Sequence, residues 1–322
     1  MPWRSARISF CWWVRMMASG SLVSVVLPTY CHAGYIADCL QSIHDQTHAE
    51  LELVLIDDCS TDGTWECAQE LLSGPLAQRF RNTVLLRNER NLGAHATINR
   101  AIAAARGGHI SLINSDDRYH PERIATLMAA LADTGSEIGF SLVDVFAEAG
   151  QAARIDEFFR LFALRQIHAV ERDPTVGFAL MRENVAISTG NLLFSRGIYE
   201  QAGPFQPLKY CHDWDFLLQA LFFSEPVVVH EPHYFYRLHE ANSFSGLGHV
   251  TPVELETATR RFLRRGLRGR PSPNPLFPCE ANWPGYFEHV LRECGYDGHM
   301  RRERDGAVAG YPFAPEQLNP CG

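Results

Sequence analysis

The feature that most constrains the fold of this chain is a repeated succession of apolar strand, polar loop and helix. Four short apolar runs carry the pattern, at 22–27, 51–56, 84–86 and 110–113. Polar loops follow the runs, and after the first of them Ile36, Leu40 and Ile43 recur at helical spacing. This alternation predicts a mostly parallel sheet with helices on both faces. Ligands of such sheets bind beyond the carboxyl ends of the strands, so function is expected there.

The pattern also divides the chain into three parts. Residues 1–20 hold an apolar stretch between arginines that is too short to span a bilayer, and we expect a non-structural N-terminal extension. Residues 21–245 contain the alternating elements and a further strand expected at 138–146. Residues 246–322 change to a basic helix, a proline-rich stretch and a short remainder, which predicts a small helical or irregular C-terminal appendage.

Charge and cysteine content narrow the class of protein. The formal net charge of -8 opposes nonspecific attraction to nucleic acid, so no nucleic-acid partner is expected. Nine cysteines are scattered without CxxC spacing, which indicates neither a disulfide framework nor a zinc site. A reducing compartment fits this pattern best, and we therefore expect a cytoplasmic protein.

Two acidic pairs end the second and the fourth apolar run. Asp57-Asp58 and Asp116-Asp117 would lie on one rim of the sheet, where like charges repel unless a cation or a hydrogen-bonding ligand compensates them. A divalent metal with a diphosphate would do so, and oxygen ligands suit Mg²⁺ or Mn²⁺. The alternative is that these carboxylates only cap the helices that follow.

Two further motifs stand in the second half of the chain. Asp213 lies between His212 and Trp214 at the start of an apolar helix. An apolar neighbour raises the proton affinity of a carboxylate and favours a general base, whereas a helix cap beside an aromatic anchor is the alternative. His239 follows Arg237 after a strand, where a phosphate or metal contact competes with the role of an ordinary structural histidine.

Together these motifs resemble family 2 glycosyltransferases with the GT-A fold. The stretches that carry the resemblance are 23–30, 54–64, 91–93, 115–117 and 212–215. They occur in the family's order within residues 22–243. The resemblance implies a Rossmann-like GT-A sheet and an enzyme that transfers a sugar from a nucleoside-diphosphate sugar to a hydroxyl group, with inversion of the anomeric centre.

The resemblance further implies roles for single residues that bind the donor. Pro28, Thr29 and Tyr30 would lie against the nucleotide base, and Asp58 would hydrogen-bond to that base. Asp116 would contact the ribose. We expect a UDP sugar, because the family often uses one.

Other residues would take part in metal binding and in the reaction itself. By the same resemblance, Asp117 and His239 would bind a divalent metal, Mn²⁺ or Mg²⁺, near the diphosphate. Asp213 would be the base that deprotonates the acceptor hydroxyl. Trp214 and Asn191 would border the pocket for donor and acceptor.

The chain departs from the family pattern at two positions. Asn114 and His212 stand where many members have an acidic residue. The first change leaves metal coordination less certain, and the second leaves Asp213 as the sole carboxylate there. The Gln-x-x-Arg-Trp stretch of processive polysaccharide synthases is absent, which favours an enzyme that adds a single sugar.

The acceptor class and two rival functions remain open at this point. We expect a glycan, a lipid-linked sugar or a cell-surface polysaccharide precursor as acceptor. The basic helix within 254–270 would either rest on the inner face of the cell membrane or expose a solvated face. A nucleotidyltransferase is disfavoured because no glycine-rich loop follows the first strand. A catalytically inactive sugar-nucleotide-binding protein is the other alternative.

Overall fold

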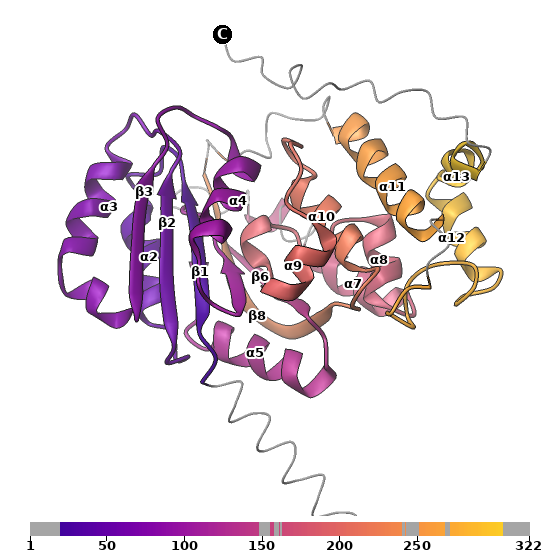
Figure 1. Cartoon of the computed structure of the whole chain (residues 1–322), viewed down its shortest axis with the longest axis horizontal. Helices are drawn as coiled ribbons and strands as arrows, with labels where there is room; N and C mark the ends of the chain where they lie inside the picture. Colours follow the sequence, from indigo (N-terminus) through magenta and orange to yellow (C-terminus); the bar gives the residue numbers. More distant parts are fainter. Residues whose placement is uncertain are drawn as a thin grey trace, which may run out of the picture.

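One eight-stranded sheet with helices on both faces forms the frame of the molecule (Figure 1). The structure is a computed structural model that describes residues 20–147, 155–157, 161, 163–239, 242, 251–267 and 271–304. Apart from Gly20, the predicted extension 1–20 lies outside the described residues. So do the predicted boundary at 245–246, positions 268–270 of the basic helix, and residues 305–322.

The sheet is parallel in its first half and mixed in its second half. Its strands are β1 (Val23–Thr29), β2 (Leu51–Asp57), β3 (Asn82–Arg87), β4 (His109–Leu112), β5 (Arg118–Tyr119), β6 (Ile138–Ala147), β7 (Leu193–Ser195) and β8 (Val227–Leu238). Their order is β3-β2-β1-β4-β7-β6-β8-β5. The first four strands are parallel, and β7 is antiparallel to both β4 and β6. Because β7 is antiparallel to both of its neighbours, β6 runs in the same direction as β1. β8 is parallel to β6 and therefore runs in that direction too.

Helices cover both faces of this sheet. They are α2 (Ile36–His44), α3 (Thr64–Ser73), α4 (Ala94–Ala104), α5 (Arg123–Thr134), α7 (Leu164–Arg172), α8 (Val176–Arg182), α9 (Arg196–Ala202), α10 (His212–Ala220), α11 (Thr251–Leu267), α12 (Tyr286–Glu293) and α13 (Asp297–Arg304). Two 3-10 turns, η1 (Pro75–Arg79) and η3 (Thr189–Asn191), complete the described elements named here. None of the helices in the described ranges has both the length and the hydrophobicity that a membrane crossing needs.

The side chains of the central strands alternate between two cores, one on each face. In β2, Val54 and Ile56 join the core that contains α4, α8 and α10, whereas Leu53 and Leu55 join the core that contains α2 and α5. A strand that is buried on both faces is apolar throughout, which explains the continuous apolar runs in the sequence. Each fully buried Val, Leu or Ile side chain contributes about 1.5–3 kcal/mol to folding. The predicted α/β sheet is thereby confirmed.

The described C-terminal helices extend one of these cores. In Figure 1, α11 lies alongside α10, and the two helices are in contact. Ala258, Phe262 and Leu263 of α11 are at most 2% exposed and belong to the same core as Phe216 and Leu217 of α10. The described part of the predicted appendage therefore shares its core with the sheet domain.

Candidate active site

The carboxyl ends of the strands that run with β1 bring distant parts of the chain to one edge of the sheet. β1 and β2 end in register, with Thr29 opposite Asp57. The loop after β1 carries His32, the loop after β4 carries Asp116, and His239 directly follows β8. Three loops that are far apart in the sequence therefore meet where the alternation pattern predicted a site.

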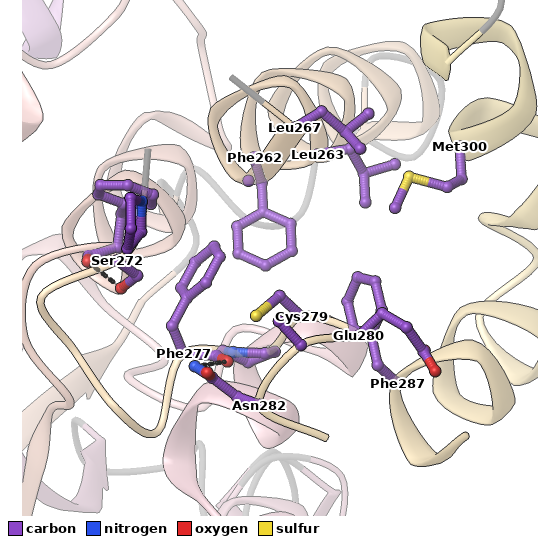
Figure 2. Close-up of a pocket in the computed structure, with 15 residues that line it drawn as sticks. Phe262, Leu263, Leu267, Ser272, Phe277, Cys279, Glu280, Asn282, Phe287 and Met300 are labelled. Atoms are coloured by element: carbon purple, nitrogen blue, oxygen red, sulfur yellow. Dashed lines mark hydrogen bonds between the residues drawn. The ribbon is translucent and has the colours of Figure 1, made fainter. Parts of the chain in front are cut away.

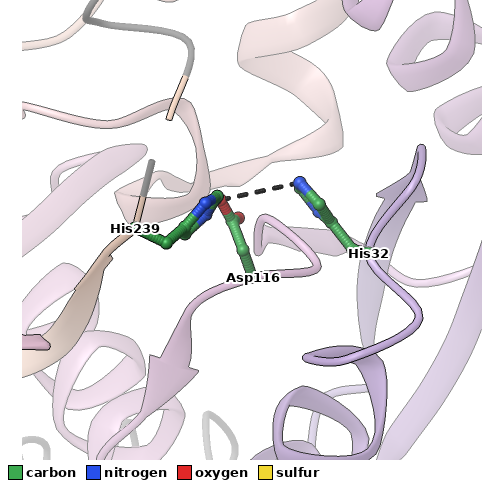
Figure 3. A group of neighbouring side chains, drawn as sticks. All are labelled: His32, Asp116 and His239. Atoms are coloured by element: carbon green, nitrogen blue, oxygen red, sulfur yellow. Dashed lines mark hydrogen bonds and ion pairs between the residues drawn. The ribbon is translucent and has the colours of Figure 1, made fainter. Parts of the chain in front are cut away.

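An acidic residue and two histidines face one another at this edge (Figure 3). Asp116 Oδ2 lies 3.0 Å from His239 Nε2 and 3.8 Å from His32 Nε2. One nitrogen or oxygen atom from each of the three side chains lies within 4.8 Å of the others. A carboxylate oxygen with two imidazole nitrogens is a donor set that suits a divalent transition metal, so the residues present fit such an ion.

Neighbouring groups orient this cluster and set its charge. Ser115 Oγ lies 2.7 Å from His32 Nδ1, and Arg237 Nε donates to the Asp116 carbonyl oxygen at 2.7 Å. Burial raises the pKa of Asp116, but the hydrogen bond with His239 and the charge of His32 outweigh burial and lower the pKa. Burial lowers the pKa of His32 and outweighs the charge of Asp116, which raises it. A carboxylate beside a neutral imidazole is the protonation state that a cation requires.

Asp117 lies in a different environment from its neighbour. Its side chain is buried, at 1% exposure. Three protein donors surround its carboxylate: Tyr234 Oη at 2.5 Å, the Arg237 backbone nitrogen at 2.9 Å and Asn114 Nδ2 at 3.1 Å. Burial and the charge of Asp116 raise its pKa well above the usual value. The sequence predicted a metal at Asp117 and His239, but the carboxylate that faces His239 is that of Asp116.

The residues predicted to bind the nucleotide surround the ends of β1 and β2. Tyr30 is 46% exposed, Pro28 is half-buried, and Thr29 is buried with its hydroxyl donating to Asp57 Oδ1 at 3.2 Å. Tyr30 is thus the one of these three with a largely exposed side chain.

Asp58 connects the end of β2 to the loop before α4. Its Oδ1 accepts from Asn88 Nδ2 at 2.6 Å and from the Leu92 backbone nitrogen at 2.8 Å. Its Oδ2 accepts from the backbone nitrogen of Gly93 at 2.9 Å. Gly93 has φ of 83°, a conformation that favours glycine, and it immediately precedes α4. The carboxylate therefore fixes a glycine turn at the rim of the site.

Asp213 occupies the first turn of α10. Its Oδ1 accepts from the Trp214 backbone nitrogen at 2.7 Å, and its Oδ2 accepts from Asn184 Nδ2 at 3.2 Å. The neighbouring His212 Nε2 lies 3.0 Å from Thr189 Oγ1.

The segment 188–189 joins the start of α10 to the loop after β4. Asn114 Nδ2 donates to Ser188 Oγ at 2.9 Å, and Thr189 contacts His212 as described. Ser188 and Thr189 therefore connect the loop that carries Asp116 and Asp117 to the start of α10, where Asp213 lies.

The two predicted pocket residues have their side-chain polar groups hydrogen-bonded to the protein itself. Trp214 is 9% exposed, and its Nε1 donates to the Leu180 carbonyl oxygen at 2.7 Å. Asn191 is fully buried, and its Nδ2 donates to the carbonyl oxygens of Ser141 at 2.8 Å and Ala186 at 3.0 Å. Its Oδ1 accepts from the Ser141 backbone nitrogen at 3.2 Å. Both side chains hold neighbouring elements together in the interior.

α11 forms hydrogen bonds with the segment that precedes Asp213. The Glu254 carboxylate is 5% exposed and accepts from three successive backbone nitrogens, those of Lys209 at 2.6 Å, Tyr210 at 2.8 Å and Cys211 at 3.1 Å. About two helical turns further along α11, Arg261 Nη1 donates to Asp215 Oδ2 at 2.5 Å. α11 thus holds both the segment before α10 and the first turn of α10.

The arginine-rich helix uses its apolar face within the protein. Phe262 and Leu263 are each 2% exposed, and Arg265 donates to Gln219 Oε1 at 2.9 Å and to the Ala202 carbonyl oxygen at 3.0 Å. Phe262 and Leu263 are therefore not available to a membrane, and a membrane contact through the described residues 254–267 would depend mainly on arginines.

A cavity of about 410 Å³ lies among α11, α12, α13 and the segment between α11 and α12 (Figure 2). Its walls are mainly apolar and include Phe262, Leu263, Phe277, Phe287 and Met300. None of the residues that the sequence predicted for the site lines it.

Sequence reasoning missed several residues of the site. His32 carries a recognisable signal, because it is a histidine in the loop that follows the first strand. Tyr234, Ser188 and Asn184 have no local signature, because their role depends on contacts with residues at least 29 positions away. Glu254 resembles any acidic residue in the first turn of a helix.

Comparison with known proteins supports the geometry. The model of the family described as Glycosyl transferase family 2 matches residues 24–198. TuaG of Bacillus subtilis, whose name places it in teichuronic acid biosynthesis, is 30% identical over 129 residues, which cover 40% of this chain and 49% of TuaG. The chain thus spans about half the length of that relative. An uncharacterised protein of Mycobacterium tuberculosis is 27% identical over 302 residues, which cover 91% of this chain and 90% of that protein.

Solved structures share the fold. Staphylococcus aureus TarS, in complex with UDP-GlcNAc, superposes with a TM-score of 0.61 at 18% identity, over 92% of this chain and 77% of that chain. The mannosyltransferase PcManGT of Pyrobaculum calidifontis, in complex with GDP-Man and Mn²⁺, superposes with a TM-score of 0.57 at 15% identity, over 98% of this chain and 87% of that chain. The family match, the sheet order and the edge where Asp116, His239 and the start of α10 meet agree: this chain is a GT-A-fold enzyme of glycosyltransferase family 2.

Proposed function

We propose that this glycosyltransferase moves a sugar from a nucleoside-diphosphate sugar to a hydroxyl acceptor, with inversion and with the help of a divalent metal. The observation that carries the proposal is the joining of two groups at one edge of the sheet. One group is the Asp116–His239 pair, and the other is Asp213 in the first turn of α10, connected to the first through Ser188 and Thr189.

The nucleotide would bind at the ends of β1 and β2. Tyr30 offers an exposed ring on which a base stacks, and Pro28 and Thr29 shape the backbone beneath it. Among the described residues, Asp58 Oδ2 accepts one hydrogen bond, from the backbone nitrogen of Gly93. A carboxylate oxygen has room for two, so Asp58 Oδ2 retains one position for a donor group of the base.

The metal would bind at Asp116 and His239, and not at Asp117. A divalent ion in this place neutralises charge on the departing nucleoside diphosphate. Asp117 would have a structural role, because its three hydrogen bonds hold Tyr234, Asn114 and the backbone of Arg237 in place. Asp116 would also contact the ribose, as the resemblance implies.

Asp213 would act as the general base. The acceptor oxygen forms a bond to the anomeric carbon while the bond from that carbon to the phosphate oxygen breaks, and the acceptor proton passes to Asp213. A single displacement of this kind inverts the anomeric centre. Asn184 orients the carboxylate, and Trp214 and Asn191 support the pocket from the interior.

The names of related proteins support a cell-surface acceptor. TuaG is named for teichuronic acid biosynthesis, and WcaA of Escherichia coli for colanic acid biosynthesis. TarS was solved with UDP-GlcNAc and PcManGT with GDP-Man. We favour a UDP sugar as donor and a polysaccharide precursor as acceptor, used in the cytoplasm or at the inner face of the cell membrane.

The test is a donor screen with purified protein and Mn²⁺. Nucleoside diphosphate release is scored for UDP, GDP and dTDP sugars, with a polysaccharide precursor as acceptor. Release from one donor class supports the proposal, and silence from all of them contradicts it. Pyrophosphate release from a nucleoside triphosphate and a sugar phosphate would favour the nucleotidyltransferase instead.

Asp213→Asn provides the matched variant for this screen. We expect turnover to fall by about 10²–10⁴-fold, because the amide cannot accept the acceptor proton. Donor affinity measured by calorimetry should change little. Parallel loss of turnover and donor affinity would show that Asp213 is structural.

A further inference from the structure

Hydrogen bonds fix both the backbone and the ring of His32 at the edge of the sheet where Asp116 and His239 lie. Its backbone nitrogen donates to Thr64 Oγ1 at 2.8 Å, and its carbonyl oxygen accepts from the backbone nitrogens of Tyr35 and Ile36 at 2.9 and 3.0 Å. Its Nδ1 lies 2.7 Å from Ser115 Oγ. The other ring nitrogen, Nε2, is thereby directed toward Asp116 (Figure 3).

We propose that His32 is a third protein ligand of the divalent ion, so that two imidazoles and one carboxylate bind it and favour Mn²⁺ or Co²⁺ over Mg²⁺. This inference rests on the proposed metal site at Asp116 and His239. In the metal-bound state, His32 Nδ1 donates to Ser115 Oγ, which leaves the Nε2 lone pair for the ion. Proteins usually orient a metal-binding histidine by such a hydrogen bond from the ring nitrogen that does not bind the metal.

The two rings approach Asp116 from different directions. The His32 and His239 ring centroids are 5.9 Å apart, and the ring planes are inclined by 83°. Imidazole lone pairs lie in the ring plane, so nearly perpendicular rings can direct them to one point. His120, Glu122 and His233 form a second group whose ligand atoms lie within 4.8 Å of one another, but there the two rings stack at 4.5 Å with planes only 6° apart.

Within the described part of the chain, Asp116 is the carboxylate that meets the two histidines, so a second imidazole would supply a further ligand. Asn114 is an amide and not a carboxylate, and its Nδ2 donates to Asp117 Oδ2 and to Ser188 Oγ. Asp117 accepts three hydrogen bonds from the protein. Asp116 is then the carboxylate that faces the two imidazoles. Mg²⁺ prefers oxygen ligands, whereas nitrogen ligands raise the affinity for first-row transition metals.

The test is to count nitrogen ligands on bound Mn²⁺ by electron spin echo envelope modulation. Mn²⁺ is titrated into the full chain, alone and with UDP, for the native protein, His32→Ala, His32→Asn and His239→Ala. We expect two coupled nitrogens in the native protein and one in each variant. Calorimetry should show that both His32 variants bind Mn²⁺ and Co²⁺ at least about tenfold more weakly, with little change for Mg²⁺.

Two controls keep the outcomes separate. His44→Ala removes an exposed histidine that contacts Asp45, and it should leave metal binding as it is. Melting curves without metal verify that each variant is folded. One coupled nitrogen in the native protein, or unchanged Mn²⁺ affinity in folded His32 variants while His239→Ala loses it, overturns the third-ligand inference alone. Failure of the native protein to bind Mn²⁺ with or without UDP overturns the proposed metal assistance as well.

Discussion

Two adjacent aspartates have opposite environments in this protein. The Asp116 carboxylate faces two histidines at the edge of the sheet, and its pKa is lowered. The Asp117 carboxylate is buried among three donors, and its pKa is raised. The two therefore differ in what they contribute. Asp116 is available to a ligand, whereas Asp117 holds the end of β8 against the loop that follows β4.

This difference predicts that Asp117→Asn destabilises the fold. An amide nitrogen in place of Oδ1 would meet the donating backbone nitrogen of Arg237, and in place of Oδ2 it would meet the donating amide nitrogen of Asn114. Leaving a buried donor unsatisfied costs about 1–3 kcal/mol, which urea unfolding should detect. Asp116→Asn is the matched control, and it should reduce turnover with a smaller loss of stability. Equal stabilities of the two variants would contradict the assignment.

A second buried carboxylate predicts a pH dependence of stability. Burial raises the pKa of Asp215 to about 7, because it outweighs the charges of Arg261 and Arg265. The unfolded chain has a pKa of about 3.9 for Asp, so the folded state binds this proton more tightly. The contribution of Asp215 to the free energy of unfolding therefore falls as pH rises from about 4 to about 7.

Asp215→Asn should remove that contribution. Urea unfolding between about pH 5 and about pH 8 should show a flatter decline for the variant than for the native protein. Glu231→Gln, at an exposed position of β8, is the control and should follow the native curve. Parallel curves for the native protein and Asp215→Asn would show that Asp215 does not titrate in this range.

At the scale of elements, the contact between α10 and α11 links the C-terminal helices to the first turn of α10, which carries Asp213. Glu254 binds the three backbone nitrogens just before α10, and Arg261 binds Asp215 within its first turn. The orientation of Asp213 thus depends on a helix that begins 38 residues later in the sequence. The basic residues of α11 have structural contacts that a purely solvated face would lack.

Glu254→Gln should lower both turnover and stability. The amide offers one acceptor oxygen in place of two, so at least one backbone nitrogen among Lys209, Tyr210 and Cys211 loses its partner, at about 1–3 kcal/mol. We expect a lower kcat with a nearly unchanged KM for the donor. Glu256→Gln, which removes an exposed partner of Arg260, is the control. Native kcat in a folded Glu254→Gln protein would refute a positioning role.

At the scale of the whole molecule, the sheet domain and the described C-terminal helices share one core. Phe262 of α11 packs against Phe277, with ring centroids 5.3 Å apart, and both belong to the core that contains the central strands. Because no separate core is described for the C-terminal helices, we expect the described chain to unfold as one unit.

Phe262→Ala tests this shared core. Removing the buried ring should cost about 3–5 kcal/mol and shift a single unfolding transition to lower denaturant concentration. Leu267→Ala, on the same helix but 37% exposed, should change stability by about 0.5 kcal/mol or less. Two separate transitions, with only one of them shifted by Phe262→Ala, would indicate that the C-terminal helices unfold independently.

The local pattern of the sequence was enough to predict the parallel half of the sheet and the strand at 138–146. Apolar runs and turn residues act over a few positions, so they can be recognised without knowledge of the fold. The motif residues Asp58, Asp116 and Asp213 could be identified in the same way, because each stands at a strand end or a helix start.

Only the folded chain decided how these pieces combine. The reversal of β7, the pairing of β8 with β6 and the choice of Asp116 as the carboxylate that meets His239 all join distant residues. Asp116 and His239 are 123 positions apart, and their contact depends on the whole sheet between them. Periodicity shows which face of an element is buried, but it carries no information about which distant side chain lies opposite. For that physical reason the roles of Tyr234 and Glu254 became visible only in the tertiary structure.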